Sequence, residues 1–413
     1  MHPDRIAVYQ KKKQYTYSDL ATMVDKIASL LHSVPVFKGD RILISFSNVL
    51  EFISAYLAVL KTGCIPVLAN MDARPEKLNF IIQDVGAVGL ICHSWVFRRL
   101  KNHAGCLKFV FTAPPFPDSS SDILIHSSPD KPHFPLDLHT DFISPQNQNV
   151  SHLSLSNLSL SNLSGQTIIF TSGTTGIPKG VILSDENLMH SAGIIIDRLK
   201  LTPDDRVLIT MPFSLCAGLL HVLAHLLVGA GIVTGENTMF FGSLLSAVHS
   251  QRVTGMPAVP SFIQSVLSRY KKEFLRYCAR LRYIELSSQP SDKSLIQTLL
   301  ETLPNASIYN TYGLTEAPRA TYNHVSEHRH VCLSVGAANK DIHIQILDDQ
   351  GNLCRAGEIG EIYISGPTLA KGYWNRPEKT KAAFTRHGFK TGDLGYKNAD
   401  GKIYLKCRKN YWK

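Results

Sequence analysis

The sequence predicts an α/β protein with two doubly wound αβαβ subdomains and a small antiparallel β-barrel subdomain. Three observations lead to this fold class. The chain has 413 residues, 44% of them hydrophobic, which is more than one hydrophobic core usually serves. Segments with helical and strand periodicity alternate in two stretches, which a Ser/Asn/Leu-rich spacer separates. After residue 330 the pattern changes to short strands with turn residues between them.

The first α/β subdomain is predicted over residues 1–150. Within it, apolar residues recur at helical spacing in 20–34 and 51–63, and short β-type runs stand at 41–46 and 89–92. This alternation is typical of a sheet built from βαβ units.

A low-complexity spacer is predicted over residues 151–165, where the near-repeat SLSNLSLSNLS offers few side chains for a core. The second α/β subdomain is predicted over 166–330, because alternating strand and helix patterns resume at residue 166. The β-barrel subdomain is predicted over 331–405 from the strand patterns within 341–353 and 357–366.

Composition limits the expected partners and location. The formal net charge is +10, but no nucleic-acid recognition module accompanies it, so we expect no nucleic-acid partner. The eight cysteines are scattered without a C-x-x-C motif, which predicts reduced thiols and no structural metal. The N-terminus has no signal-peptide pattern, and two histidines interrupt the apolar run at 216–233. We therefore expect a cytoplasmic protein without a membrane span.

The segment FTSGTTGIPKGV, residues 170–181, is a candidate polyphosphate cradle. Gly173 and Gly176 let the backbone approach a ligand, while hydroxyls, free N–H groups and Lys179 supply donors and positive charge. Lys179 is followed by Gly180 rather than by Ser or Thr, so the segment is not a Walker P-loop. A Gly/Thr hairpin turn would explain the glycines but not the hydroxyls and the lysine.

This segment resembles the phosphate loop of the adenylate-forming superfamily, which includes acyl-CoA synthetases, nonribosomal peptide adenylation domains and luciferases. Motifs similar to those of the family follow in the family's order at 309–317, 360–380 and 390–405, and the stretch 38–67 resembles its N-terminal segment. The resemblance spans nearly the whole chain and corresponds to the large N-terminal domain of such enzymes.

The resemblance implies an AMP-forming acid ligase. Such an enzyme joins a carboxylic acid to ATP as acyl-AMP, releases pyrophosphate, and passes the acyl group to the thiol of CoA or of a carrier-protein phosphopantetheine. It must neutralise phosphate charge and align the attack. By the motif match, Glu316 would hold Mg²⁺ and Thr315 would contact the α-phosphate. The β and γ phosphates would be held by Thr171, Ser172, Thr174, Thr175 and Lys179.

The same match implies a nucleotide site. Asn310 and Tyr312 would face the adenine, Asp393 would accept hydrogen bonds from the ribose, and Arg408 would add a second ribose contact. Ser288 and Gln289 stand where the family has glycine-rich backbone against the adenine. The full set of expected nucleotide contacts is Thr171, Ser172, Gly173, Thr175, Gly176, Ser288, Gln289, Asn310, Thr311, Tyr312, Asp393 and Arg408.

The expected acyl pocket is a mainly apolar slot lined by Leu215, Cys216, Leu219, Leu220 and Thr311. Relatives that activate amino acids have an aspartate where Cys216 stands, and a buried ammonium without a counter-charge is costly. We therefore expect a fatty or aryl acid rather than an α-amino acid. Arg319 is expected near the far wall of the slot, either bound to a second polar group of the acid or facing solvent or phosphate.

The C-terminal end departs from the family's pattern. Residues 406–413 resemble a truncated hinge, and the swinging C-terminal domain of the family is absent from the sequence. We expect weak catalysis by these residues alone, with thioester formation the more impaired step. A C-terminal domain supplied in trans and an acyl or peptidyl carrier protein are the candidate protein partners.

Other readings remain open. The chain could be a non-catalytic module that binds ATP or an acyl-adenylate, and pyrophosphate exchange would separate it from an enzyme. It could also be an amino-acid adenylation domain. A phosphotransferase using the Gly/Thr loop would instead release ADP rather than AMP.

Overall fold

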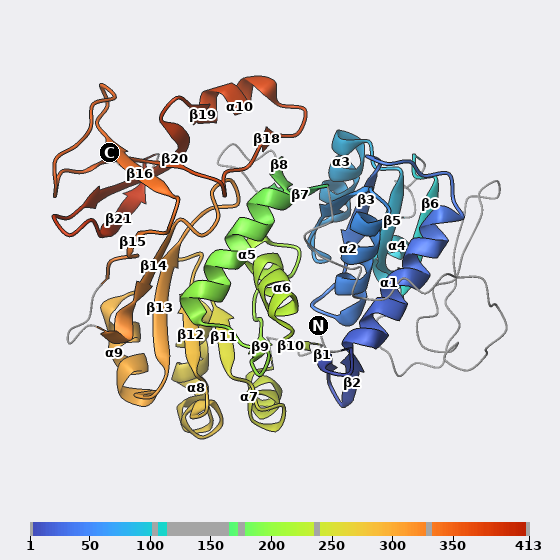
Figure 1. Cartoon of the computed structure of the whole chain (residues 1–413), viewed down its shortest axis with the longest axis horizontal. Coiled ribbons are helices and arrows are strands. Elements are labelled where there is room, and N and C mark those ends of the chain that lie inside the picture. The colour runs from blue at the N-terminus through green and yellow to red at the C-terminus, as the bar shows by residue number, and fades with distance from the viewer. Residues whose placement is uncertain are drawn as a thin grey trace.

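Three β-sheets with helices on their faces make up the computed structural model (Figure 1). It describes residues 3–100, 106–113, 165–171, 178–234, 240–327 and 333–409. Two sheets are mainly parallel and the third is antiparallel. The predicted α/β class with an added antiparallel subdomain is confirmed.

The first sheet is built around a parallel centre with an antiparallel edge. Its described strands lie in the order β18-β8-β7-β4-β3-β5-β6. Their bounds are β3 (Arg41–Ser45), β4 (Ile65–Leu68), β5 (Gly89–His93), β6 (Phe109–Ala113), β7 (Gln166–Thr171), β8 (Lys179–Ser184) and β18 (Gly372–Tyr373). Strands β7 and β8 pair antiparallel from Gln166↔Ser184 to Thr171↔Lys179. This pairing brings the two ends of the predicted phosphate loop together.

The helices of the first unit cover both faces of this sheet. They are α1 (Tyr17–His32), α2 (Leu50–Lys61), α3 (Pro75–Val85) and α4 (Ser94–Leu100). Helix α1 begins at a capping box in which Thr16 and Asp19 satisfy each other's backbone N–H groups. Successive residues of β3 face different clusters, because Ile42 packs with α1 and α2 while Leu43 packs with α3 and α4.

The second sheet contains strands from both ends of the chain. Its described order is β15-β14-β13-β12-β11-β9-β10-β1-β2. The bounds are β1 (Ile6–Gln10), β2 (Lys13–Thr16), β9 (Arg206–Leu208), β10 (Gly231–Thr234), β11 (Gly255–Ala258), β12 (Tyr283–Leu286), β13 (Ser307–Tyr312), β14 (Thr321–His324) and β15 (Ala337–Ala338). A one-turn 3₁₀ helix, Val325–Glu327, follows β14.

The sheets therefore do not follow the predicted ranges. The range 1–150 contributes β1 and β2 to the second sheet, and the range 166–330 contributes β7 and β8 to the first. Strand β1 pairs in parallel with β10. Periodicity marks a segment as a strand but does not identify its neighbour, so this exchange has no signal in the pattern. The spacer, 151–165, lies outside the described residues except for Gly165.

Helices also cover both faces of the second sheet. They are α5 (Asp185–Leu199), α6 (Cys216–Val228), α7 (Phe241–Ser250), α8 (Pro260–Cys278) and α9 (Lys293–Thr302). Ser184 caps α5 by accepting a hydrogen bond from the N–H of Asn187. Helix α6 is apolar nearly all round and is buried, while α7, α8 and α9 pack on the other face of the sheet.

The third sheet is antiparallel, with described order β16-β17-β20-β19 and β21 paired to β20. Its strands are β16 (His343–Leu347), β17 (Gly360–Ser365), β19 (Phe384–Thr385), β20 (Gly388–Lys397) and β21 (Ile403–Arg408), and α10 is Pro377–Ala383. Strand β18 lies between these elements in the chain yet pairs with β8 of the first sheet. The third sheet is thereby anchored to the β7–β8 hairpin, which flanks the predicted phosphate loop.

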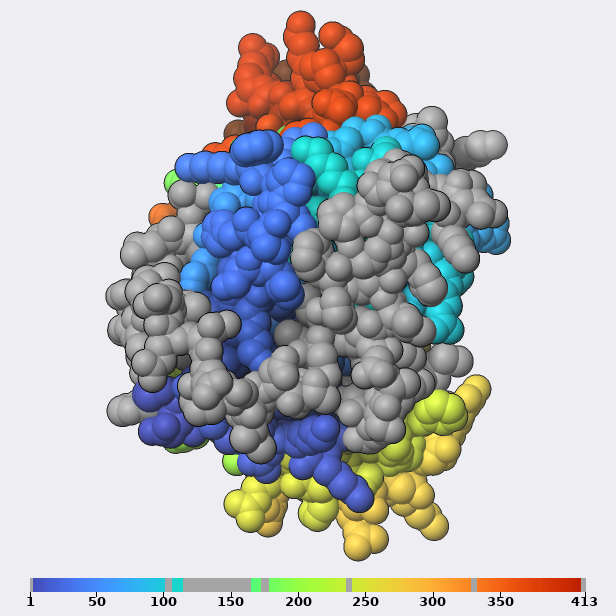
Figure 2. Space-filling view, turned by 90° about the vertical axis from the view of Figure 1, so that its right-hand side faces the viewer, coloured from blue at the N-terminus to red at the C-terminus, as the bar shows by residue number. Residues whose placement is uncertain are grey.

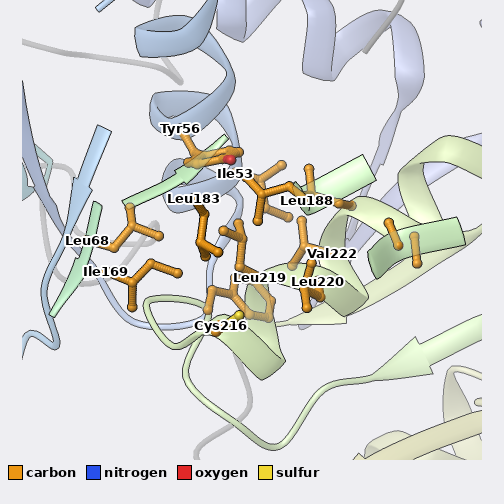
Figure 3. Close-up of a cluster of buried hydrophobic side chains, with 14 of the residues drawn as sticks. Ile53, Tyr56, Leu68, Ile169, Leu183, Leu188, Cys216, Leu219, Leu220 and Val222 are labelled. Carbon is orange, nitrogen blue, oxygen red and sulfur yellow. The ribbon is translucent and has the colours of Figure 1, made fainter. Parts of the chain in front are cut away.

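A continuous apolar core joins the two α/β units. One cluster contains residues of α1 and α2 from the first unit and of α5 and α6 from the second. Figure 3 shows part of it, with Ile53 and Tyr56 facing Leu183, Leu188 and Val222. The hydroxyl of Tyr56 is 3.0 Å from the hydroxyl oxygen of Thr167, which satisfies both groups in this apolar setting.

The outer side of the first unit is shown in Figure 2, with red residues of the C-terminal region above it and yellow residues of the second unit projecting below. None of the helices in the described ranges is long and apolar enough to cross a membrane.

Candidate functional site

A cavity of about 1070 Å³ lies at the carboxyl ends of the parallel strands β9, β11, β12 and β13. In α/β sheets this is the edge at which ligands bind. The end of β7, the start of β8 and the strands β20 and β21 complete its walls. Predicted site residues that line it are Thr171, Lys179, Leu215, Cys216, Leu220, Ser288, Thr311, Tyr312, Thr315, Glu316, Arg319 and Arg408.

One wall of the cavity combines Lys179, Glu316 and Tyr373. The Tyr373 hydroxyl donates to Glu316 Oε1 at 2.8 Å, and Lys179 Nζ lies 5.0 Å from the centre of the Tyr373 ring. Burial and the neighbouring Glu316 carboxylate raise the pKa of Tyr373, which keeps its hydroxyl protonated as a donor. Pairing of β18 with β8 sets this arrangement, because Tyr373 stands opposite Val181 in the sheet.

A second wall combines Tyr312, Asp393 and Arg408. The Tyr312 hydroxyl donates to Asp393 Oδ2 at 2.7 Å, and Arg408 Nε lies 2.9 Å from Asp393 Oδ1. Asp393 and Arg408 are direct partners in the β20–β21 register. Burial raises the pKa of Asp393, although Tyr312 and Arg408 oppose that shift. Asp393 itself stands just behind the lining residues, oriented by both neighbours.

Two predicted nucleotide contacts, Asn310 and Gln289, do not line the cavity. The Asn310 amide donates to the carbonyl oxygen of Ser334 at 3.2 Å and accepts from the Ser291 hydroxyl, so it is used inside the protein. Gln289 is exposed and accepts from the N–H of Ser261. Neither residue lines the cavity, whereas Ser288 does, with a positive φ of 68°.

The apolar end of the cavity is formed around the start of α6. Leu215, Cys216, Leu220 and Thr311 line it, and burial raises the pKa of the Cys216 thiol to about 12. Leu219 does not line the cavity; it is fully buried in the core that joins the two units (Figure 3). Successive helical residues point about 100° apart, so Leu219 and Leu220 serve the core and the cavity respectively.

Arg319 lines the same end but is already paired. Its guanidinium forms an ion pair with Glu285, a residue of β12 with no exposed surface. The Tyr322 hydroxyl donates to Glu285 Oε2 at 2.6 Å. His221 Nε2 lies 3.3 Å from Glu285 Oε1, which is the oxygen that Arg319 contacts. Burial alone would raise the pKa of Glu285, but Arg319 and His221 hold it well below its usual range. The predicted solvent-facing alternative for Arg319 does not occur.

The site contains residues that the sequence reasoning did not select. Tyr373 lies within the family-like motif at 360–380, which predicts no role for its side chain. Glu285 could have been predicted to have a buried partner, because it is a carboxylate inside the apolar strand β12. Glu361 lines the cavity within 3.0 Å of Lys409 Nζ and 3.7 Å of Lys390 Nζ. Glu361, Lys390 and Lys409 lie on different strands or strand ends, so their proximity could not be predicted from the sequence.

The central loop residues predicted to hold phosphates, Ser172, Gly173, Thr174, Thr175 and Gly176, lie outside the described residues. Thr171 and Lys179, on either side of them, both line the cavity. Among the residues that the structure describes, no three His, Cys, Asp or Glu side chains form a metal-binding group.

The model of the family described as "AMP-binding enzyme" matches residues 1–374. The chain is 28% identical to the acyl-CoA ligase sidI of Aspergillus fumigatus, covering 94% of this chain and 67% of that protein. It is 27% identical to the D-alanine–D-alanyl carrier protein ligase of Lacticaseibacillus rhamnosus, covering 99% of this chain and 76% of that protein.

The fold is similar to that of a solved structure, the O-succinylbenzoate coenzyme A synthetase of Bacillus subtilis in complex with ATP and magnesium ion. The TM-score is 0.79 with 24% sequence identity, over 99% of this chain and 78% of the other. The family model covers most of the sequence, including the predicted phosphate loop and Glu316. The chain therefore belongs to the AMP-binding enzyme family.

Proposed function

We propose that this protein activates a carboxylic acid with ATP to form acyl-AMP and pyrophosphate, and that the acyl group then passes to a thiol. The main support is the cavity itself, which has Lys179 and Glu316 on one wall and the Tyr312–Asp393–Arg408 group on another. A cation, a metal-ligating carboxylate and a carboxylate suited to sugar hydroxyls together match the needs of a magnesium nucleotide.

The residues present fit Mg²⁺ and a polyphosphate at the Lys179 wall. Glu316 offers a carboxylate oxygen, and Tyr373 donates to that carboxylate and fixes its orientation. With no three-residue metal cluster in the described ranges, a cation here would take its remaining ligands from phosphate and water, as Mg²⁺ commonly does. Bound Mg²⁺ would neutralise phosphate charge, and Lys179, on the same wall, would add a further positive charge.

We propose that Asp393 accepts hydrogen bonds from the ribose hydroxyls. Tyr312 holds one of its oxygens and Arg408 the other. Each carboxylate oxygen has more than one lone pair, so both can still accept from sugar hydroxyls. Because burial raises the pKa of Asp393, the two donors also help to keep this carboxylate ionised.

The acid is expected to be fatty or aryl and to lack an α-amine. Leu215, Cys216 and Leu220 form an apolar surface at one end of the cavity. The acidic lining residues of the described chain are Glu316 and Glu361, and Glu361 is already paired with Lys409. An α-ammonium group beside Cys216 would have no carboxylate of its own, which makes an amino acid costly to bind.

The acceptor is proposed to be CoA or the phosphopantetheine of a carrier protein. The relatives named above include one ligase of each type. Both acceptors end in the same thiol, and no described feature of the cavity separates them. A direct assay with each acceptor after acyl-AMP formation would decide between them.

Pyrophosphate exchange into ATP, measured with a panel of fatty and aryl acids, tests the proposal. We expect acid-dependent exchange that Lys179→Ala and Glu316→Gln each reduce on the order of a hundredfold. Lys272→Ala and Glu273→Gln, at exposed positions of α8, are the matched controls and should exchange normally. ATP binding without exchange for any acid would favour a binding module, and release of ADP would favour a phosphotransferase.

A further inference from the structure

A buried ion pair closes the acyl end of the cavity. Arg319 lines the cavity with only 4% of its side chain exposed, and its partner Glu285 lies behind it with none. The start of α6 borders the same place, since Arg319 Nη2 donates to the carbonyl oxygen of Ala217 at 3.3 Å. An acid lying along Cys216 and Leu220 would therefore meet the guanidinium.

The contacts of Arg319 leave part of its donor capacity unused. Nη1 donates to Glu285 and to the Tyr322 hydroxyl, and Nη2 donates to Ala217. A guanidinium carries five N–H groups. Within the described residues, these contacts use three of them. Nε–H and one N–H of Nη2 remain for a ligand.

The charge of Arg319, in contrast, is already balanced. The Glu285 carboxylate neutralises it at contact distance. Tyr322 and His221 also form hydrogen bonds with this carboxylate. His221 is neutral, because burial lowers its pKa. The cluster thus offers hydrogen-bond donors to the cavity without a net charge.

We propose that Arg319 selects acids that carry an uncharged hydrogen-bond acceptor, such as a hydroxyl, carbonyl or ether oxygen, on the part of the acyl group farthest from the reacting carboxylate. This inference rests on the proposed function. An unsubstituted acyl chain would leave the remaining donors without partners. A second carboxylate on the acid would be a buried negative charge. Arg319 could not neutralise it, because Glu285 already balances the charge of the guanidinium.

Matched acids test the selection directly. Pyrophosphate exchange is measured with hexanoate, octanoate and decanoate, with phenylacetate, and with the ω-hydroxy and ω-carboxy or para-hydroxy and para-carboxy analogue of each. For the acyl length that fits the cavity, we expect kcat/KM for the hydroxy acid to exceed that for either analogue by about tenfold. This comparison uses the unaltered chain, so it does not depend on a variant that folds.

Two variants separate selection by Arg319 from a purely structural role. Arg319→Met should abolish the preference for the hydroxy acid, measured as the ratio of kcat/KM for the hydroxy acid to kcat/KM for the unsubstituted acid. Glu285→Gln leaves the guanidinium without its counter-charge and should shift the preference toward the dicarboxylate. Arg282→Met is the matched control: Arg282 pairs with the buried Asp205 at 2.9 Å outside the cavity, and its loss should leave acid preference unchanged.

The outcomes distinguish this inference from the function on which it rests. Exchange with no acid in the panel would contradict both. Exchange at equal efficiency across each matched set, or a preference for the unsubstituted acid or the dicarboxylate, would contradict the role of Arg319 and leave the acid ligase intact.

Discussion

The buried histidine His225 should make the protein lose stability in mild acid. It has no exposed surface, and its Nδ1 lies 2.7 Å from the carbonyl oxygen of His221. Nδ1 must therefore carry the proton, and Nε2 accepts from the Tyr283 hydroxyl at 3.1 Å. Burial, with the neighbouring His221, lowers the pKa of His225 to about 3.

The sign of the effect follows from linkage. A histidine with a lowered folded-state pKa contributes stability that is complete above its unfolded pKa of about 6.5 and is lost as the pH falls toward about 3. Between about pH 7 and about pH 5, the unfolded chain binds a proton that the folded chain does not. The free energy of unfolding should fall by about 2 kcal/mol from His225 alone.

The measurement compares the wild type with His225→Gln by urea unfolding at these two pH values. Glutamine keeps a polar side chain but does not titrate, so the pH-dependent loss should shrink by about 2 kcal/mol even if the variant is less stable throughout. The comparison between variants is essential because Asp185 acts in the opposite direction. Burial raises its pKa to about 6, so its protonation increases the free energy of unfolding as the pH falls over the same interval. His249→Gln, at an exposed position of α7, is the control.

Equal pH-dependent losses in the wild type and in His225→Gln would refute the reasoning. That result would mean that His225 takes up a proton in the folded protein, and hence that the hydrogen bonds assigned to its two ring nitrogens are wrong.

Further changes have expected outcomes of their own. Tyr312→Phe removes a donor from Asp393, so the Kd for ATP in isothermal titration should rise about tenfold; an unchanged Kd would argue against Asp393 in the nucleotide site. Gly218→Ala, at the start of α6, would place a methyl group against the backbone carbonyl of Pro212 and should lower the free energy of unfolding by about 1–3 kcal/mol. In the control Gly193→Ala the new methyl group meets open space, so the free energy of unfolding should not fall. Asp185→Asn should melt above the wild type at neutral pH but not near pH 4, because its raised pKa makes the ionised carboxylate unfavourable; equal melting at neutral pH would contradict this.

The elements of the fold were predictable where periodicity is strong, as in helices α1 and α2 and strands β3 and β5. Strand partners were not, because an alternating pattern is the same whichever strand lies beside it. Strand β18 shows this most clearly, since it joins the first sheet although its chain neighbours β17 and β19 belong to the third. Likewise, β1 and β2 join the second sheet, whereas β3 to β6, which follow them in the chain, belong to the first.

The predicted site residues that motifs mark, such as Lys179, Glu316 and Tyr312, do line one cavity. Asn310 does not, because serines from two distant segments take up its amide. These serines belong to no motif, so the sequence offered no sign of the competition. The pairing of Arg319 with Glu285 could not be predicted from the sequence either. The position of the Glu285 carboxylate inside an apolar strand indicated only that some cation must lie beside it.

The crossing of β18 into the first sheet limits how the molecule can come apart. Lys371 N–H donates to the carbonyl of Ile182, and Trp374 N–H donates to that of Gly180, so the antiparallel C-terminal region is stitched to the hairpin on which Lys179 lies. At the other end, β1 and β2 stitch the N-terminal unit to the middle one. No single cut in the backbone therefore yields pieces with complete sheets, and the three sheets should melt as one cooperative body.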